Sequence, residues 1–249
     1  MIKEYFRPKK LNEAIDILGK NALAIPMGGG TSLGHRNEDI SVVDLQDLDL
    51  SYIRKEDDNF DIGSMTTLEE IYKFFQDNGS INRALKIEGS KNQRIQGSLG
   101  GFLRLAGGRS PLLTCFLTLN CLVFYAEEAH GTLLSEFLKV RDSGKKLITH
   151  ISIEDPAGLL FESVSRSPLD LPIVCCAVYN GGIEIRAAVG GFGDVPKIVP
   201  KNYFVQNNNV ELSKYLLFST DEWASSNYRT NITQIILNRL IDLSKKGDQ

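Results

Sequence analysis

The chain has 249 residues, of which 42% are hydrophobic and 24% are charged, and its formal net charge is −3 at pH 7. These values are typical of a globular protein with a sizeable core, and they give no general attraction for nucleic acid or anionic membranes. The first ten residues lack the apolar segment of a secretory signal, and no stretch approaches the roughly 20 apolar residues that cross a bilayer. We therefore expect a cytoplasmic protein with no nucleic-acid or membrane partner.

The first 50 residues predict a compact β-α-β-loop-β unit. A short strand at 5–8 precedes a helix at 11–18, whose apolar residues recur at helical spacing and which ends near Gly19. The segment 22–25 is a short buried strand that Pro26 and three glycines cut off, and 40–45 is the next strand. The unit therefore carries a glycine-rich loop directly after its second strand.

The middle of the chain alternates between strands and helices. Residues 59–64 are strand-like, and the following TTLEEI places a threonine three positions before a glutamate, as in a capping box. The helix that begins there continues through 75 and stops near 78–79. A polar stretch from 88 to 101 leads into an apolar region at 111–125, which we expect to be a buried helix running into a strand. A short helix at 133–140 and a strand at 147–153 follow.

The C-terminal third predicts an antiparallel sheet and a terminal helix. Apolar strands at 173–179 and 183–189 are joined by Asn-Gly-Gly, which is a hairpin signal. A polar run at 206–209 reads as a loop, and apolar residues recur at helical spacing from 231 to 245. The expected fold class is α+β, with a domain boundary between 163 and 171.

The cysteines indicate no metal chemistry. None of the four forms a C-x-x-C pair, and all lie in apolar surroundings, where a free thiol behaves as a small hydrophobe. We expect buried, reduced thiols and neither a metal site nor an iron–sulfur cluster in this chain. The sequence also offers no paired acid and base, so no side chain is predicted to be catalytic.

Two glycine-rich segments carry the functional signal. PMGGGTSL at 26–33 follows a strand, and its glycines let successive backbone N–H groups face an anion without a Cβ clash. GSLGG at 97–101 also lies between elements. The spacing is not the G-x-G-x-x-G of a Rossmann site, and no Lys-Ser/Thr pair follows as in a P-loop. Either segment alone fits a structural turn, whereas the pair fits the diphosphate of a dinucleotide.

Further motifs accompany these segments in order. They are the opening YFRPKKLNEAIDIL, then DLQDL, IGSMTTLEEI and RIQGSLGG, and downstream SRSPLDLPIVCCAV, IRAAVGGFGDVP and DEWASSNYR. In their order and spacing, the motifs resemble those of the FAD-binding subunit of the xanthine dehydrogenase and carbon monoxide dehydrogenase family of molybdenum hydroxylases. The resemblance covers nearly the whole chain.

The resemblance implies a PCMH-type FAD-binding domain at 1–166, made of two α/β subdomains (about 1–52 and 53–166), and a smaller C-terminal domain at 167–249 with an antiparallel sheet and helix. It implies that FAD receives electrons from an iron–sulfur subunit, in a complex with a molybdopterin-binding subunit, and passes them to NAD⁺ or another acceptor. The residues that it places at the cofactor are Pro26, Met27, Gly28, Gly29, Gly30, Thr31, Ser32, Leu33, Arg94, Ser98, Leu99, Gly100, Gly101 and Arg109.

The chain departs from the family pattern at three places. Phe102 replaces an asparagine, Ser110-Pro111 stands where an aspartate is expected, and Ser163 replaces a lysine. Either the site is rebuilt, with Arg104 or Arg109 neutralising phosphate, or FAD affinity is reduced. Arg94 likewise has two interpretations, as a phosphate partner or as a solvated surface residue.

Three functions remain open from the sequence. The first is an FAD-binding electron-transfer subunit of a molybdenum-hydroxylase-type complex. The second is a flavin-poor structural or assembly subunit that keeps the fold. The third is a stand-alone flavin oxidoreductase that acts on a small substrate.

Overall fold

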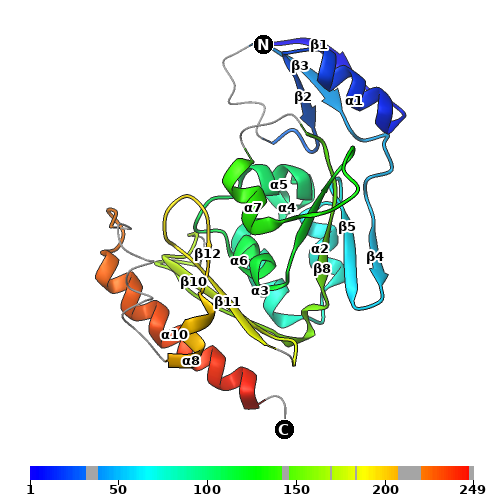
Figure 1. Ribbon diagram of the computed structural model, residues 1–249. Helices are drawn as coiled ribbons and strands as arrows, with labels where there is room; N and C mark the ends of the chain where they lie inside the picture. Colours follow the sequence, from blue (N-terminus) through cyan, green and yellow to red (C-terminus); the bar gives the residue numbers. More distant parts are fainter. Residues whose placement is uncertain (32–38, 142–145, 169, 183, 207–219, 247–249) are drawn as a thin grey trace. The chain divides into compact units, whose positions relative to one another are not determined.

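The computed structural model describes residues 1–31, 39–141, 146–168, 170–182, 184–206 and 220–246 (Figure 1). The chain forms two compact units, each built from three separate stretches. Unit 1 contains Met1–Phe74, Ser90–Leu105 and Leu122–Ile153, and unit 2 contains Phe75–Gly89, Ala106–Cys121 and Glu154–Gln249. No single cut in the chain separates these units, so the domain boundary expected at 163–171 stays a prediction.

The first part of unit 1 is a three-stranded parallel sheet in the order β1-β3-β2. Its strands are β1 (Ile2–Phe6), β2 (Ala24–Met27) and β3 (Ile40–Asp44), and α1 (Leu11–Lys20) connects the first two. The buried side of α1 packs in a cluster with residues of β2 and β3, because its apolar residues recur on one helical face. The predicted β-α-β-loop-β order is confirmed.

The second part of unit 1 is a five-stranded sheet in the order β4-β5-β8-β6-β7. Its strands are β4 (Ile53–Glu56), β5 (Asn59–Gly63), β6 (Leu122–Tyr125), β7 (Thr132–Leu133) and β8 (Ile148–Glu154). The helices of the same unit that follow in the chain are α2 (Leu68–Phe74), α4 (Lys91–Gln96), α5 (Leu99–Leu105) and α7 (Leu134–Val140).

Capping side chains explain where α2 and α4 begin. The Thr67 amide donates to Glu70 Oε2 (2.7 Å) and the Glu70 amide donates to Thr67 Oγ1 (3.2 Å), which confirms the predicted capping box. Ser90 and Gln93 form a second box at the start of α4. The polar stretch 88–101 therefore contains a helix that was not predicted, α4, which its own polar side chains cap.

Unit 2 contains a four-stranded antiparallel sheet in the order β12-β11-β10-β9. Its strands are β9 (Leu159–Val164), β10 (Val174–Asn180), β11 (Ile185–Gly190) and β12 (Lys197–Ile198), and a 3₁₀ turn at Pro156–Gly158 precedes β9. The β10–β11 hairpin is confirmed, whereas β9 is absent from the predicted elements. The α+β fold class with a C-terminal antiparallel sheet and helix is confirmed.

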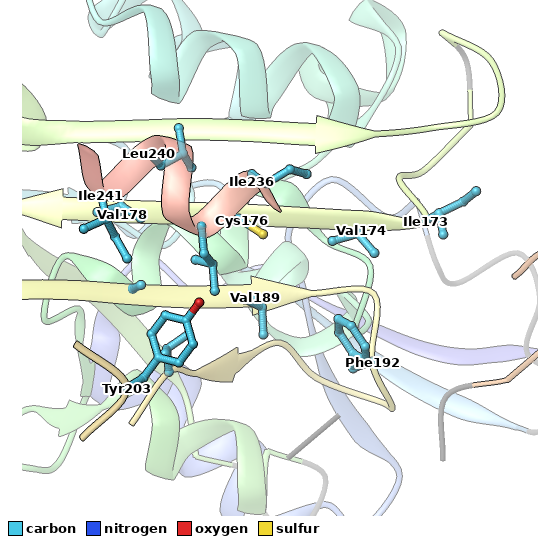
Figure 2. Close-up of a cluster of buried hydrophobic side chains, with 13 residues drawn as sticks. Ile173, Val174, Cys176, Val178, Val189, Phe192, Tyr203, Ile236, Leu240 and Ile241 are labelled. Atoms are coloured by element: carbon cyan, nitrogen blue, oxygen red, sulfur yellow. The ribbon is translucent and has the colours of Figure 1, made fainter. Parts of the chain in front are cut away.

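Two helices, α6 (Pro111–Thr118) and α10 (Ser226–Lys246), pack on β10. Cys176 and its alternate neighbours on β10 share a cluster with residues of α10 (Figure 2), whereas Cys175 contacts Thr114 of α6. Because both faces of β10 are covered, its sequence is apolar up to the final residue, Asn180. The unit also contains α3 (Gly79–Glu88), which the sequence does not predict, and α8 (Lys201–Gln206). The loop expected at 206–209 starts on the last residue of α8 and otherwise lies outside the described residues.

The cysteines are Cys115, Cys121, Cys175 and Cys176, and all four are buried and free, as expected. Burial raises the pKa of the Cys175 thiol to about 12, so this thiol stays protonated at neutral pH. Among the described residues, no group of three His, Cys, Asp or Glu side chains is arranged to hold a metal ion. No helix in the same part of the chain has the length and apolar character needed to cross a membrane.

Candidate cofactor site

The two glycine-rich segments lie in contact with each other in unit 1. A Cβ atom on Gly28 would lie 2.2 Å from Ser98 Oγ, and one on Gly29 would lie 1.5 Å from the carbonyl oxygen of Gln96. The second distance ends on backbone, which cannot move aside as a flexible side chain can. The tertiary structure therefore brings together two segments that are far apart in the sequence, and it requires glycine where they touch.

The glycines of the first segment offer backbone donors. Within the described part of the chain, the amide N–H groups of Gly28, Gly29 and Gly30 have no hydrogen-bond acceptor. Gly30 has a φ of 69°, in the left-handed region that favours glycine. Successive amides in such a turn form a concave site for an anion. This part of the prediction agrees with the geometry.

The other predicted residues of the first segment flank these glycines. Pro26 and Met27 are the last residues before the glycines and belong to β2. Thr31 is exposed and is the last described residue of the segment. Ser32 and Leu33 lie outside the described residues, so their predicted contact with the cofactor has no structural counterpart here.

The second segment is the start of a helix rather than a loop. Leu99, Gly100 and Gly101 form the first turn of α5. Each of their amides already has an acceptor: Thr66 O for Leu99 (2.8 Å), Ser64 O for Gly100 (2.8 Å) and Ser98 Oγ for Gly101 (3.4 Å). The expectation of free backbone amides is therefore wrong for these three residues of the second segment. Its remaining donors near the junction are the Ser98 amide, which has no acceptor among the described residues, and side-chain hydroxyls.

One such hydroxyl was not among the predicted site residues. Ser64 is 3% exposed, and its Oγ has no hydrogen-bond partner among the residues that the structure describes. Its Cβ lies 3.2 Å from the position that a Cβ atom would take on Gly100, so the side chain lies beside the second segment. The available signal was a serine directly after the strand at 59–63, inside the motif IGSMTTLEEI.

Arg94 is buried, so its interpretation as a solvated surface residue is wrong. Its Nε donates to Glu69 Oε2 at 2.9 Å, and both side chains are less than a tenth exposed. The guanidinium also lies over the ring of Tyr72, 4.7 Å from the centroid. These contacts join α4 to α2 and support a positioning role for Arg94. Its direct contact with a phosphate stays a prediction.

Arg109 belongs to unit 2, where its guanidinium is held by other parts of that unit. Its Nε donates to Pro172 O at 2.8 Å, and its guanidinium stacks on Trp223 at 4.0 Å from the ring centroid. Arg166 stacks on the same ring at 4.1 Å. Burial, with a contribution from the nearby Arg229, lowers the pKa of Arg109. These contacts explain the position of Arg109, and its predicted role at a phosphate is not tested by them.

The residues that depart from the family pattern have local structural roles. Ser110 caps α6 through its Oγ, and Pro111 takes one of the first helical positions, where a missing N–H costs nothing. Arg104, the alternative phosphate partner, donates from Nη2 to Lys146 O at 2.7 Å. The other two departures lie in regular elements, Phe102 in α5 and Ser163 in β9.

A pocket of about 710 Å³ opens elsewhere in unit 1, between α1 and the residues around Tyr125. Its charged lining has both signs, with Asp16 and Glu127 beside Lys20 and Lys146. None of the described residues of the glycine segments lines it. The pocket is therefore separate from the predicted cofactor site.

Comparison with known proteins by sequence finds a matching family and a related protein. Residues 1–154 match the family model described as the FAD binding domain in molybdopterin dehydrogenase. The chain is also 28% identical over 187 residues to the uncharacterized protein YgfM of Escherichia coli strain K12. The matched region covers 72% of this chain and 70% of that protein.

Solved structures share the fold over nearly the whole length. A chain of quinoline 2-oxidoreductase from Pseudomonas putida 86 matches with a TM-score of 0.81 and 20% identity, over 98% of this chain and 97% of that chain. A chain of reconstituted CO dehydrogenase from Oligotropha carboxidovorans matches with a TM-score of 0.78 and 19% identity, over 98% of this chain and 97% of that chain. At such identities the likeness concerns the fold. The sequence match is more specific, and by it the chain belongs to the family of FAD-binding domains of molybdopterin dehydrogenases, whose cofactor is FAD.

Proposed function

We propose that this protein is the FAD-binding subunit of a molybdenum-hydroxylase-type complex. The observation that carries the proposal is the junction of the two glycine segments, where the amides of Gly28, Gly29 and Gly30 have no acceptor in the described part of the chain. A concave row of N–H groups suits the negative charge of a diphosphate. Membership of the FAD-binding family identifies the dinucleotide.

The residues at this junction fit the cofactor. The free amides of the first segment would hold diphosphate oxygens, and the Ser98 hydroxyl, at the contact with Gly28, would add a side-chain donor. FAD supplies the redox chemistry when it is bound, while the protein binds and orients it. No side chain of this chain is assigned a catalytic role in the proposal.

The partners form part of the same proposal. Electrons would reach this subunit from an iron–sulfur subunit, in a complex that also contains a molybdopterin-binding subunit, and would leave to NAD⁺ or another acceptor. The proposal draws support from the fold shared with quinoline 2-oxidoreductase and with an enzyme described as a Cu,Mo-CO dehydrogenase. A xanthine dehydrogenase-like activity of the complex is the specific form that the sequence motifs favour.

A second candidate is a structural or assembly subunit that binds FAD weakly. It is favoured by the second segment, in which the amides of Leu99, Gly100 and Gly101 already have acceptors inside the protein. It is favoured also by Arg94 and Arg109, whose guanidinium groups have protein partners. A site with fewer free donors holds an anion less tightly.

A titration of the purified protein with FAD separates the two candidates. For the first, the visible flavin bands and flavin fluorescence should show saturable uptake, and FAD should raise the thermal unfolding midpoint. Bleaching of the bound flavin by NADH would support NAD⁺ as the acceptor. A colourless protein that neither takes up FAD nor is stabilised by it would contradict the first candidate, and co-purification with an iron–sulfur subunit would then support the second.

A further inference from the structure

The Ser64 hydroxyl is an exception among the buried polar groups near the glycine segments. The backbone of Ser64 is fully used, since its amide donates to Thr149 O and its carbonyl accepts from the Gly100 amide, both at 2.8 Å. Its Oγ, in contrast, is buried without a hydrogen-bond partner among the described residues. A buried hydroxyl without a partner reduces stability, so a protein gains by replacing it with alanine unless the hydroxyl has another use.

Ser64 lies at the junction of the two segments. Its Cβ is 3.2 Å from the position that a Cβ atom would take on Gly100 in the second segment. The next residue, Met65, places its Sδ 3.5 Å from the corresponding position on Gly28 in the first segment. Ser64 therefore borders the second segment and Met65 borders the first, near the place where the two segments touch.

The two segments differ in the hydrogen-bond donors that they offer at this junction. The first segment has free amides, whereas the amides of Leu99, Gly100 and Gly101 in the second segment already have acceptors. Near the second segment, a ligand oxygen can therefore be bound by the Ser98 amide, which has no acceptor among the described residues, and by the hydroxyls of Ser98 and Ser64. A serine hydroxyl rotates about its Cα–Cβ and Cβ–Oγ bonds, so it can turn toward a ligand without movement of the backbone.

We propose that the Ser64 hydroxyl donates a hydrogen bond to a phosphate oxygen of the FAD diphosphate. This inference rests on the proposed function, because it requires the dinucleotide to bind at the junction of the segments. It explains why a polar atom is kept at a buried position, since a hydrogen bond to a charged oxygen is stronger than one between neutral groups. It also adds a side-chain donor beside the second segment, where the amides of Leu99, Gly100 and Gly101 already have acceptors.

The variant Ser64→Ala tests the proposal through two measurements, the affinity for ligands and the thermal unfolding midpoint. If Ser64 had only a structural role, the substitution would lower both. Dissociation constants are measured by fluorescence for FAD and by calorimetry for ADP, which has the diphosphate without the flavin, and for riboflavin, which has the flavin without phosphate. We expect about tenfold weaker binding of FAD and ADP and unchanged binding of riboflavin. In the absence of ligand, the thermal unfolding midpoint of the variant should equal or exceed that of the wild type.

Ser244→Ala is the matched control, because Ser244 is also a buried serine but its Oγ donates to Ile241 O at 2.8 Å. This control should lower the unfolding midpoint and leave the affinity for FAD unchanged. Equal affinities of wild type and Ser64→Ala for FAD and ADP would overturn the inference alone. A lower midpoint of ligand-free Ser64→Ala, with weaker binding of all three ligands, would also overturn it. A wild-type protein that binds neither FAD nor ADP would overturn the proposed function itself.

Discussion

The carbonyl oxygen of Gln96 lies 1.5 Å from the position that a Cβ atom would take on Gly29, so the first glycine segment rests directly on the last residue of α4. Gly29 is therefore required by a contact within the protein, independently of any ligand. A loss of FAD binding in a Gly29 variant would report on this packing as well as on the cofactor site. Probes of the site must be chosen where a side chain has room.

Gly29→Ala should destabilise the protein, because its methyl group collides with backbone that cannot turn away. We expect a loss of about 1–3 kcal/mol in the free energy of unfolding, measured with urea in the absence of FAD. Gly19→Ala is the control, since a Cβ atom there meets nothing within 4 Å, and it lies inside α1. That variant should be neutral or more stable by up to about 1 kcal/mol. Equal stabilities of Gly29→Ala and wild type would contradict the contact.

Gly101→Ala is the better probe of the proposed site. A Cβ atom on Gly101 meets only the Ser98 Oγ, at 3.2 Å, and the residue is exposed in α5. Alanine favours helix over glycine by about 1 kcal/mol, so the free energy of unfolding should not fall. The methyl group displaces the Ser98 hydroxyl, which the proposal assigns to the diphosphate, so the dissociation constant for FAD should rise severalfold. An unchanged dissociation constant would remove Gly101 and Ser98 from the proposed site.

Arg94→Met should be among the most damaging changes in unit 1. It leaves the buried carboxylate of Glu69 without its partner, and breaking a buried ion pair in this way costs about 3–5 kcal/mol. The double variant Arg94→Met/Glu69→Leu removes both charges and should recover much of that loss. Urea unfolding of the two single variants and the double variant gives the coupling energy. If the losses in free energy of unfolding of the two single variants add up to that of the double variant, the two side chains do not stabilise each other.

We expect the buried carboxyl of Glu88 to make the stability of unit 2 depend on pH. Burial raises the pKa of this carboxyl from 4.5 to about 7, although hydrogen bonds from the Leu112 amide (3.0 Å) and Ser110 Oγ (2.7 Å) act in the opposite direction. Between these two values the folded protein holds a proton that the unfolded chain has lost. The contribution of Glu88 to the free energy of unfolding is therefore full below pH 4.5 and declines as the pH rises to about 7, by at most about 3 kcal/mol.

Glu88→Gln removes this titration while keeping the size of the side chain. Urea unfolding of wild type and variant at several pH values across this window should show a difference that shifts in favour of the glutamine variant as the pH rises. The comparison with the variant cancels the contributions of other titrating groups. A difference between the two proteins that stays constant with pH would show that Glu88 titrates alike in the folded and unfolded states.

Local signals in the sequence explain the elements that were predicted correctly. The helical spacing in α1, the Asn-Gly-Gly turn between β10 and β11, and the capping box of Thr67 and Glu70 each depend on residues close together in the chain. Strand β9 lacks a comparable signal and becomes regular through its partner β10. Helix α3 has a local signal that the prediction did not use, since the Asn78 side chain at its start accepts from the Ile81 amide. Propensity is weak where tertiary contacts decide the conformation.

The sequence by itself determined the fold class, the family and the two segments where a diphosphate would bind, because motif order and periodicity are properties of the chain alone. Only the tertiary structure decided which donors in those segments are free. It shows that the amides of Gly28, Gly29 and Gly30 lack acceptors within the described residues and that those of Leu99, Gly100 and Gly101 are already bonded. It also buries Arg94 against Glu69 and leaves the Ser64 hydroxyl without a partner among the same residues. The physical reason is that hydrogen bonds and burial are satisfied between residues distant in sequence, which no single motif records.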